Sequence, residues 1–215
     1  SLRRRGIRGE AIVDAMVELG TSTSNVDLAM SSIYANNREL VDDGTDRAFL
    51  VRADGPDAPG AVEMPVEGGP DAGEPPVHPD HEERGRRTIP VEGAVYVEAD
   101  DLPPAGERVW LKGLGCVSRE DDRFVATDDD IDVVRSGGVD VVHWVPVAGA
   151  VPTRLRTMDG DVTGYAEPGV ADYDADELVQ FERVGFARID SPPGGASADG
   201  DGTTDGGVDG DGTTD

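Results

Sequence analysis

The spacing of apolar residues changes from a helical period to a strand period near residue 45. In residues 10–19 and 26–41 the apolar side chains recur every three or four positions. Gly20 and Gly44 follow these two runs, and a glycine commonly ends a helix at such a position. We therefore predict two short helices within residues 1–45.

After residue 45, apolar and polar residues alternate in short segments separated by Gly, Pro and Asp clusters. The predicted strands cover residues 47–52, 61–66, 88–91, 94–98, 108–112, 123–127, 131–134, 139–147, 153–157 and 162–166. No helical pattern lies between them. Many short strands at near-regular spacing predict a mainly β protein with one or two β-barrels.

Residues 179–189 form the last strongly patterned segment, and their alternation predicts a single edge strand. One face of this strand would be apolar, with Arg183 as its only charge. The other face would carry Gln180, Glu182 and Arg188 beside apolar side chains. An amide, a carboxylate and a guanidinium on one face could read a nucleobase, and an ordinary edge strand with a salt bridge is the alternative.

The final residues, 193–215, contain the sequence DGDGTTD twice, at 199–205 and 209–215. From residue 199 onward Val208 is the only apolar residue, so burial cannot offset the entropy of ordering this segment. Alternating aspartates could indicate a Ca²⁺ loop, but the glycine and glutamate of an EF-hand are missing from their positions. We predict a disordered acidic tail.

The chain is strongly acidic, with 45 acidic and 19 basic residues, a net charge of −26, and Lys112 as its only lysine. Such acidity normally indicates disorder or repels nucleic acid. Here the acids lie in segments with clear apolar patterning, so we attribute them to adaptation to high salt and do not exclude an RNA partner. At ~1 M salt the Debye length is about 3 Å, and bidentate arginine contacts survive better than diffuse attraction.

Several chemistries are excluded by the residues available. Cys116 is the only cysteine, which excludes an internal disulfide and a cysteine metal site. His78 and His81 lack a further close ligand, so we predict no metal site. No catalytic constellation is visible, and no apolar run approaches the ~20 residues of a membrane span. We expect a cytoplasmic protein without a membrane partner.

Several separated stretches, taken in order, resemble the glutamyl- and glutaminyl-tRNA synthetases. They are SLRRRGI at residues 1–7, YANNR at 34–38, DRAFLV at 46–51, HPD at 78–80 with RGRR at 84–87, VHWV at 142–145 and QFERVGF at 180–186. Each stretch is weak alone, and their common order makes the resemblance specific. The RGRR form and the salt-adapted composition are more similar to the archaeal glutamyl enzyme, from a halophile, than to the bacterial glutaminyl enzyme.

The resemblance implies a stem-contact and anticodon-binding architecture. Residues 1–45 would form a helical stem-contact segment, and residues 46–192 an anticodon-binding double β-barrel. The proximal barrel would combine residues 46–92 and 150–190, and the distal barrel would contain residues 93–149. The strand around Gln180 would then return beside the strand at Arg47, and residues 193–215 would remain a disordered tail.

The resemblance also implies roles for individual residues. Positions that read anticodon bases in the glutaminyl relatives are matched by Gln180, Glu182 and Arg183. Edge reading requires an amide or a carboxylate, and arginines supply phosphate and base contacts. Further anticodon contacts would be Arg47, Arg84, Arg86 and Arg87. Contacts to the tRNA stem would be Arg3, Arg4, Arg5 and Arg38. For an isolated arginine, pairing with one of the many acids is the alternative.

The function implied is that of the tRNA-binding C-terminal region of a glutamate–tRNA ligase. An N-terminal catalytic domain of the same polypeptide would use ATP and Mg²⁺ to form glutamyl-adenylate and charge tRNA(Glu), with tRNA(Gln) as a second candidate. The chain has no HIGH-type motif and no lysine-bearing signature loop, so we expect it to bind no cofactor and to be inactive alone. A glutamine–tRNA ligase region and a stand-alone RNA-binding β-barrel are the alternatives.

Overall fold

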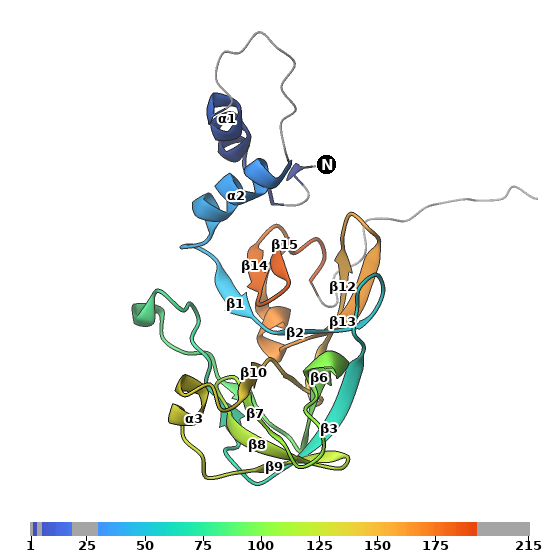
Figure 1. The fold of residues 1–215 in the computed structure, drawn as a ribbon. Coiled ribbons are helices and arrows are strands. Elements are labelled where there is room, and N and C mark those ends of the chain that lie inside the picture. Colours follow the sequence, from blue (N-terminus) through green and yellow to red (C-terminus); the bar gives the residue numbers. More distant parts are fainter. Residues whose placement is uncertain (1, 4–5, 19–29, 193–215) are drawn as a thin grey trace, which may run out of the picture.

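The computed structural model describes residues 2–3, 6–18 and 30–192, and its strands lie below a pair of short helices (Figure 1). The predicted tail at 193–215 and the predicted stem contacts Arg4 and Arg5 lie outside the described residues. The mainly β fold with a short helical part is confirmed.

The two predicted helices are confirmed as α1 (Gly9–Glu18) and α2 (Met30–Val41). They pack through a small core that contains Ile7, Ala15 and Ile33. Asn37 of α2 ties the start of the described chain to this pair, because its Oδ1 accepts the Arg8 backbone N–H at 2.8 Å. The helical pattern therefore buries a narrow stripe of each helix.

Two three-stranded sheets lie next to the helices. The first has the order β1 (Asp46–Ala48), β14 (Leu178–Phe181), β15 (Gly185–Arg188), and the second has the order β12 (Val151–Arg156), β13 (Asp161–Ala166), β2 (Leu50–Asp54). Strands β1 and β14 are parallel, and Arg47 lies opposite Gln180. The expected return of the Gln180 strand beside Arg47 is thus confirmed.

Seven further strands form one curled sheet (Figure 1). Its order is β10 (Asp140–Val142), β7 (Arg108–Leu111), β8 (Gly115–Glu120), β9 (Arg123–Ala126), β3 (Ala61–Glu67), β6 (Ala94–Glu98), β11 (Val145–Pro146). Its inner face buries Val97, Leu111, Phe124 and Trp144, and Phe49 from the β1–β2 connection joins this core.

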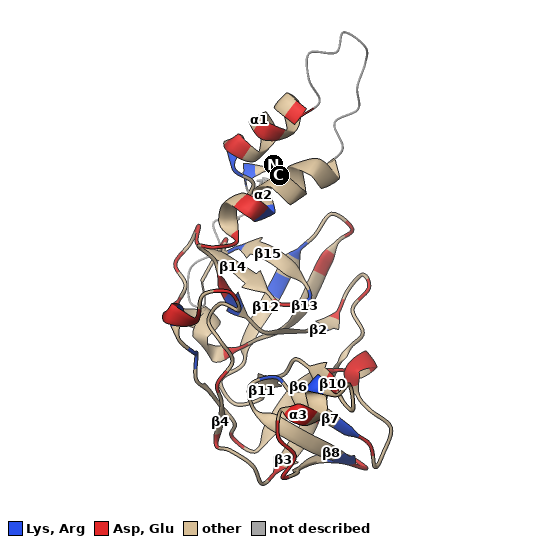
Figure 2. Cartoon of the chain, turned by 60° about the vertical axis from the view of Figure 1, so that its left-hand side comes forward, with Lys and Arg blue, Asp and Glu red and all other residues tan. Residues whose placement is uncertain are grey.

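Short elements complete the fold. A two-stranded ladder joins β4 (Ala72–Gly73) to β5 (Ile89–Pro90), and the 3₁₀ turns are η2 (Glu82–Arg84), η3 (Ala99–Asp101) and η4 (Pro168–Asp172). Acidic residues occur throughout the helices, strands and loops (Figure 2).

Three strand predictions are wrong in their detail. Residues 131–134, predicted as a strand, contribute to the helical turn α3 (Asp132–Arg135), which starts where the Asp132 N–H donates to the Asp130 carboxylate at 2.8 Å. Residues 139–147 divide into β10 and β11, which pair with different strands at opposite edges of the large sheet. Apart from these wrong predictions, β8 is missing from the predicted strands, and its C-terminal half carries the charged residues Arg119 and Glu120.

The third correction concerns residues 179–189, which form a hairpin rather than one edge strand. Strands β14 and β15 pair in antiparallel fashion, with Phe181 opposite Gly185. The backbone of Arg183 has φ of 65° and that of Gly185 has φ of 137°, and these left-handed conformations reverse the chain. Alternation continues on both sides of the turn, so the period of two hides the reversal. Arg183 therefore lies in a turn and not on the apolar face of a strand.

Candidate functional site

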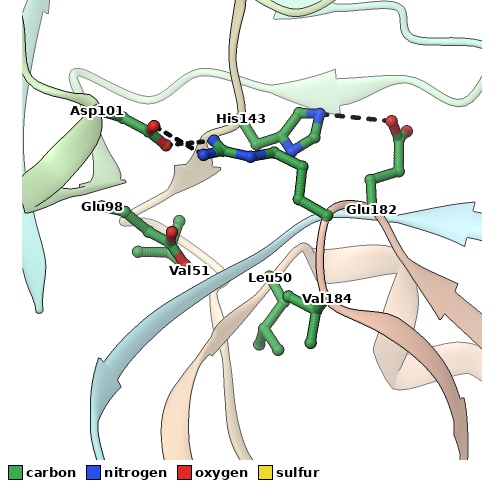
Figure 3. Close-up of a pocket in the computed structure, with 8 residues that line it drawn as sticks. Leu50, Val51, Glu98, Asp101, His143, Glu182 and Val184 are labelled. Carbon is green, nitrogen blue, oxygen red and sulfur yellow. Dashed lines mark hydrogen bonds and ion pairs between the residues drawn. The ribbon is translucent and has the colours of Figure 1, made fainter. Parts of the chain in front are cut away.

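The turn between β14 and β15 lies against the seven-stranded sheet, where segments distant in the sequence converge. Glu182 and Arg183 occupy this turn, and the Glu182 backbone N–H donates to the Ala48 carbonyl at 3.0 Å. Figure 3 shows Glu182 directed toward His143, with Asp101 and Glu98 on the facing side. The turn therefore joins the small sheet to the large one.

Glu182 is the centre of an internal ionic cluster. Its carboxylate contacts Lys112 Nζ, and it lies 3.4 Å from both His143 Nε2 and Arg87 Nη2. Burial alone would raise the pKa of Glu182, but hydrogen bonds from His143 and Lys112 outweigh this effect and hold the pKa at about 2. The side chain is 13 % exposed. Glu182 is thus a largely buried carboxylate that stays ionised.

Arg87 is the second centre of this cluster. Its Nε donates to Glu167 at 2.7 Å, its Nη1 donates to the Pro76 carbonyl, and its guanidinium lies 4.6 Å from the centre of the Phe49 ring. The second oxygen of Glu167 accepts the Phe49 backbone N–H at 2.7 Å. Burial raises the pKa of Glu167, and the Arg87 charge opposes that rise. With 14 % of its side chain exposed, Arg87 is mainly an internal residue.

Arg183 points toward the large sheet and remains partly open to solvent. Its two terminal nitrogens bind the two oxygens of Asp101, and the Nη2–Oδ1 distance is 2.9 Å. The hydrogen bond to Asp101 raises the pKa of Arg183 above its ordinary value. Beside this pair, Arg52 binds both oxygens of Glu98, at 2.7 and 2.9 Å. Two bidentate pairs therefore line the same junction.

The other predicted anticodon contacts differ in their exposure and in the partners that they bind within the protein. Arg47 is 7 % exposed and binds Asp42 at 2.9 Å. Arg84 binds the Asp46 carboxylate, and Arg86 is exposed and donates to a backbone carbonyl. Gln180 is half-buried, and its Oε1 has no hydrogen-bond partner within the part of the chain that the structure describes.

The structure describes two of the predicted stem contacts, and both are exposed. Arg3 lies near the start of the chain and Arg38 in the last turn of α2. Within the described ranges no group of three or more His, Cys, Asp or Glu residues could hold a metal ion. No helix among the described residues is long and apolar enough to cross a membrane.

Six residues of the junction are not among the sequence-predicted site residues: Arg52, Glu98, Asp101, Lys112, His143 and Glu167. One signal was available for Lys112, because it is the only lysine in an arginine-rich chain. For the others no local pattern exists, because the residues that meet at this junction are far apart in the sequence. The partners of Glu182 show this: His143 lies 39 positions from Glu182, Lys112 lies 70 and Arg87 lies 95. His143 stacks on Phe49 with 4.9 Å between ring centres, which places its ring inside the junction.

Two family models match this chain, and both carry the description "tRNA synthetases class I (E and Q), anti-codon binding domain". They match residues 45–135 and 141–190. The chain is 70 % identical over 190 residues to a glutamate–tRNA ligase of Natronomonas pharaonis and 67 % identical over 190 residues to one of Haloarcula marismortui. Each alignment covers 88 % of this chain and 32 % of the relative.

A more distant relative gives the same picture. The glutamate–tRNA ligase of Methanosarcina mazei is 36 % identical over 200 residues, which cover 90 % of this chain and 34 % of the relative. The chain therefore spans about a third of the length of the curated relatives that it matches.

Proposed function

The chain belongs to the class I tRNA synthetases of the E and Q type through their anticodon-binding domain, and on this premise we propose that it recognises the anticodon of tRNA(Glu). The observation that carries this proposal is the 70 % identity to a glutamate–tRNA ligase. The relatives reported above are all glutamate enzymes, which favours glutamate over the glutamine alternative. A halophilic relative also accounts for the net charge of −26.

The complete enzyme would attach glutamate to tRNA in the cytoplasm in an ATP-dependent reaction. A catalytic domain of the same polypeptide would bind ATP, Mg²⁺ and glutamate, which is consistent with the length of the relatives. The residues of this chain would supply affinity for the tRNA and discrimination between anticodons. We expect no ATP–pyrophosphate exchange from the 215-residue chain alone.

The geometry divides the predicted contacts into two groups. Arg183 and Arg86 are exposed and can reach RNA, whereas the Oε1 of Gln180 is buried and is not open to a base edge in this conformation. Arg87 and Glu182 are engaged inside the protein, so their role would be to shape the turn that carries Arg183. Arg3 and Arg38 remain candidates for the stem.

Binding of transcripts tests the proposal directly. In molar KCl, the chain should bind a tRNA(Glu) transcript more tightly than a tRNA(Gln) transcript, whose anticodon differs at the third position. Exchanging that base in tRNA(Glu) should remove the preference. Equal binding to all three RNAs would show that the third base is not read, and anticodon recognition would be overturned if exchanging the first two anticodon bases also left binding unchanged. Preference for tRNA(Gln) would favour the glutamine alternative.

The salt dependence provides a second measurement. Bidentate and stacking contacts of arginine act at short range, so affinity should fall with KCl less steeply than for a lysine-rich relative. A slope near ~0.9 per phosphate over many phosphates would contradict this expectation.

A further inference from the structure

Arg183 is held by a carboxylate that is itself fixed in the protein. Asp101 ends the turn η3 next to the large sheet, and its side chain is 13 % exposed, whereas that of Arg183 is 47 % exposed. Both terminal nitrogens of the guanidinium face the Asp101 oxygens. The exposed part of Arg183 is therefore not the edge that makes the ion pair.

An RNA phosphate is a poor competitor for this edge. Releasing Arg183 would leave the mostly buried Asp101 carboxylate without its partner, and an unpaired buried charge is strongly unfavourable. Arg52, the neighbouring cation within the described part of the chain, is not free to replace it, because it already binds both oxygens of Glu98. We therefore expect the Arg183–Asp101 pair to persist when RNA binds.

A guanidinium held by its edge still offers its flat faces. Splayed RNA bases stack on aromatic rings and on arginine planes, and this contact tolerates high salt better than a diffuse charge. The cavity beneath the turn, between Leu50, Glu98 and Arg183, has a volume of about 10 Å³. That is room for about one water molecule, so a base must lie on the turn rather than inside it.

We propose that Asp101 is a positioning residue, which orients the Arg183 guanidinium as a flat platform on which an unstacked RNA base lies. This inference rests on the proposed tRNA binding and names a residue that sets its strength. The backbone at Arg183 supports it, because φ of 65° is a conformation that favours glycine, and the chain nevertheless places a long side chain there. Glu182, bound by Lys112 and His143, anchors the preceding position.

The direction in which one substitution changes the affinity for tRNA distinguishes this proposal from a simple effect of net charge. Removing a negative charge from a protein that binds a polyanion should raise affinity. Asp101→Asn should instead lower the affinity of the chain for a tRNA(Glu) transcript, by about tenfold, as expected for the loss of one stacked base. The matched control is Asp100→Asn, which removes the same charge from the exposed neighbouring residue of η3. Its affinity should stay the same or rise.

Two further measurements exclude a merely structural role. In an Arg183→Ala background, Asp101→Asn should cause no further loss of affinity, because the platform is already absent. A set of tRNA(Glu) transcripts, each with one anticodon base removed to leave an abasic site, should contain one RNA that wild type and Asp101→Asn bind equally. Arg183→Lys keeps the charge without the planar group and should weaken binding as much as alanine.

The outcomes distinguish failure of the inference from failure of the proposed function. If the wild-type chain does not discriminate tRNA(Glu) from other tRNAs, the proposed function is wrong. If it does, but Asp101→Asn behaves like Asp100→Asn or keeps its effect in the Arg183→Ala background, the positioning role is wrong. Thermal melting checks that each variant is folded, and if Asp101→Asn does not fold, unchanged affinity of Arg183→Lys still overturns the inference.

Discussion

Lys112, the only lysine of the chain, contacts the carboxylate of Glu182, 70 positions further along. The two residues belong to different sheets, with Lys112 next to β7 and Glu182 in the β14–β15 turn. His143 and Arg87 approach the same carboxylate from two other segments. A single anion thus connects parts of the chain that share no local pattern, and the stability of the junction can be tested through it.

Lys112→Met should destabilise the folded chain by about 1–3 kcal/mol. Methionine preserves the length of the side chain but leaves Glu182 without one of its hydrogen-bond donors. Urea unfolding at constant KCl measures the change. The control is Arg135→Met, which breaks an exposed pair with Asp132 in α3. Exposed pairs contribute little, so that loss should stay within ~0.5 kcal/mol, and equal losses for the two variants would argue against the internal cluster.

Acid should remove the contribution of Glu182 to stability. Its pKa of about 2 in the folded chain lies below the ordinary value of 4.5, so the stabilisation is complete above pH 4.5 and is lost as the pH falls through 2. A shift of this size corresponds to about 3 kcal/mol. The free energy of unfolding, measured between pH 6 and the acid limit, should therefore fall less for Glu182→Gln than for wild type.

Glu167 acts in the opposite sense in the same experiment. Burial favours the protonated form of Glu167 and so raises its pKa. Glu167 therefore favours the folded state at low pH, and this contribution to stability is lost as the pH rises. This residue is present in both proteins. The charge of Glu182 is the weakest of the influences on the pKa of Glu167, so the difference between wild type and Glu182→Gln reports mainly on Glu182. Identical pH profiles for the two proteins would contradict the lowered pKa.

Arg87→Lys should cost about 2–4 kcal/mol, although it preserves the charge. A lysine cannot contact Glu167 and the Pro76 carbonyl while stacking on the Phe49 ring, as the guanidinium does. The neighbouring Arg86 is exposed, and its side chain donates to the Glu74 carbonyl, a contact that a lysine can also make. Arg86→Lys should change the free energy of unfolding by less than ~0.5 kcal/mol. Similar values for both would contradict the internal role of Arg87.

Gly164→Ala should destabilise the second small sheet by at least ~2 kcal/mol. A Cβ atom at this position would lie 2.2 Å from the Val51 carbonyl oxygen, and this neighbour is backbone that cannot rotate away. The close approach occurs at the register shift between β13 and β2. Gly169→Ala is the control, because its Cβ would meet nothing within 4 Å. A melting temperature of Gly164→Ala equal to that of the control would show that the strands separate at little cost.

Local patterns were sufficient for part of the fold. The change of period near residue 45 separated α1 and α2 from the strands, because burial of one face acts on consecutive residues. The hairpin at residues 178–188 was hidden, because Arg183 reverses the chain without interrupting the alternation. The pattern predicts a strand where the turn α3 forms, because a short apolar run has no period that distinguishes a strand from a helical turn.

The candidate site shows the same division more sharply. By itself the sequence determined which side chains are available, namely the amide, carboxylate and guanidinium of Gln180, Glu182 and Arg183, and the arginine-rich character of the chain. Only the tertiary structure decided that Glu182 faces inward to Lys112 and that Arg183 is held by Asp101, 82 positions away. The packing of two sheets against each other determines which residues form ion pairs, and no periodicity of consecutive residues encodes that packing.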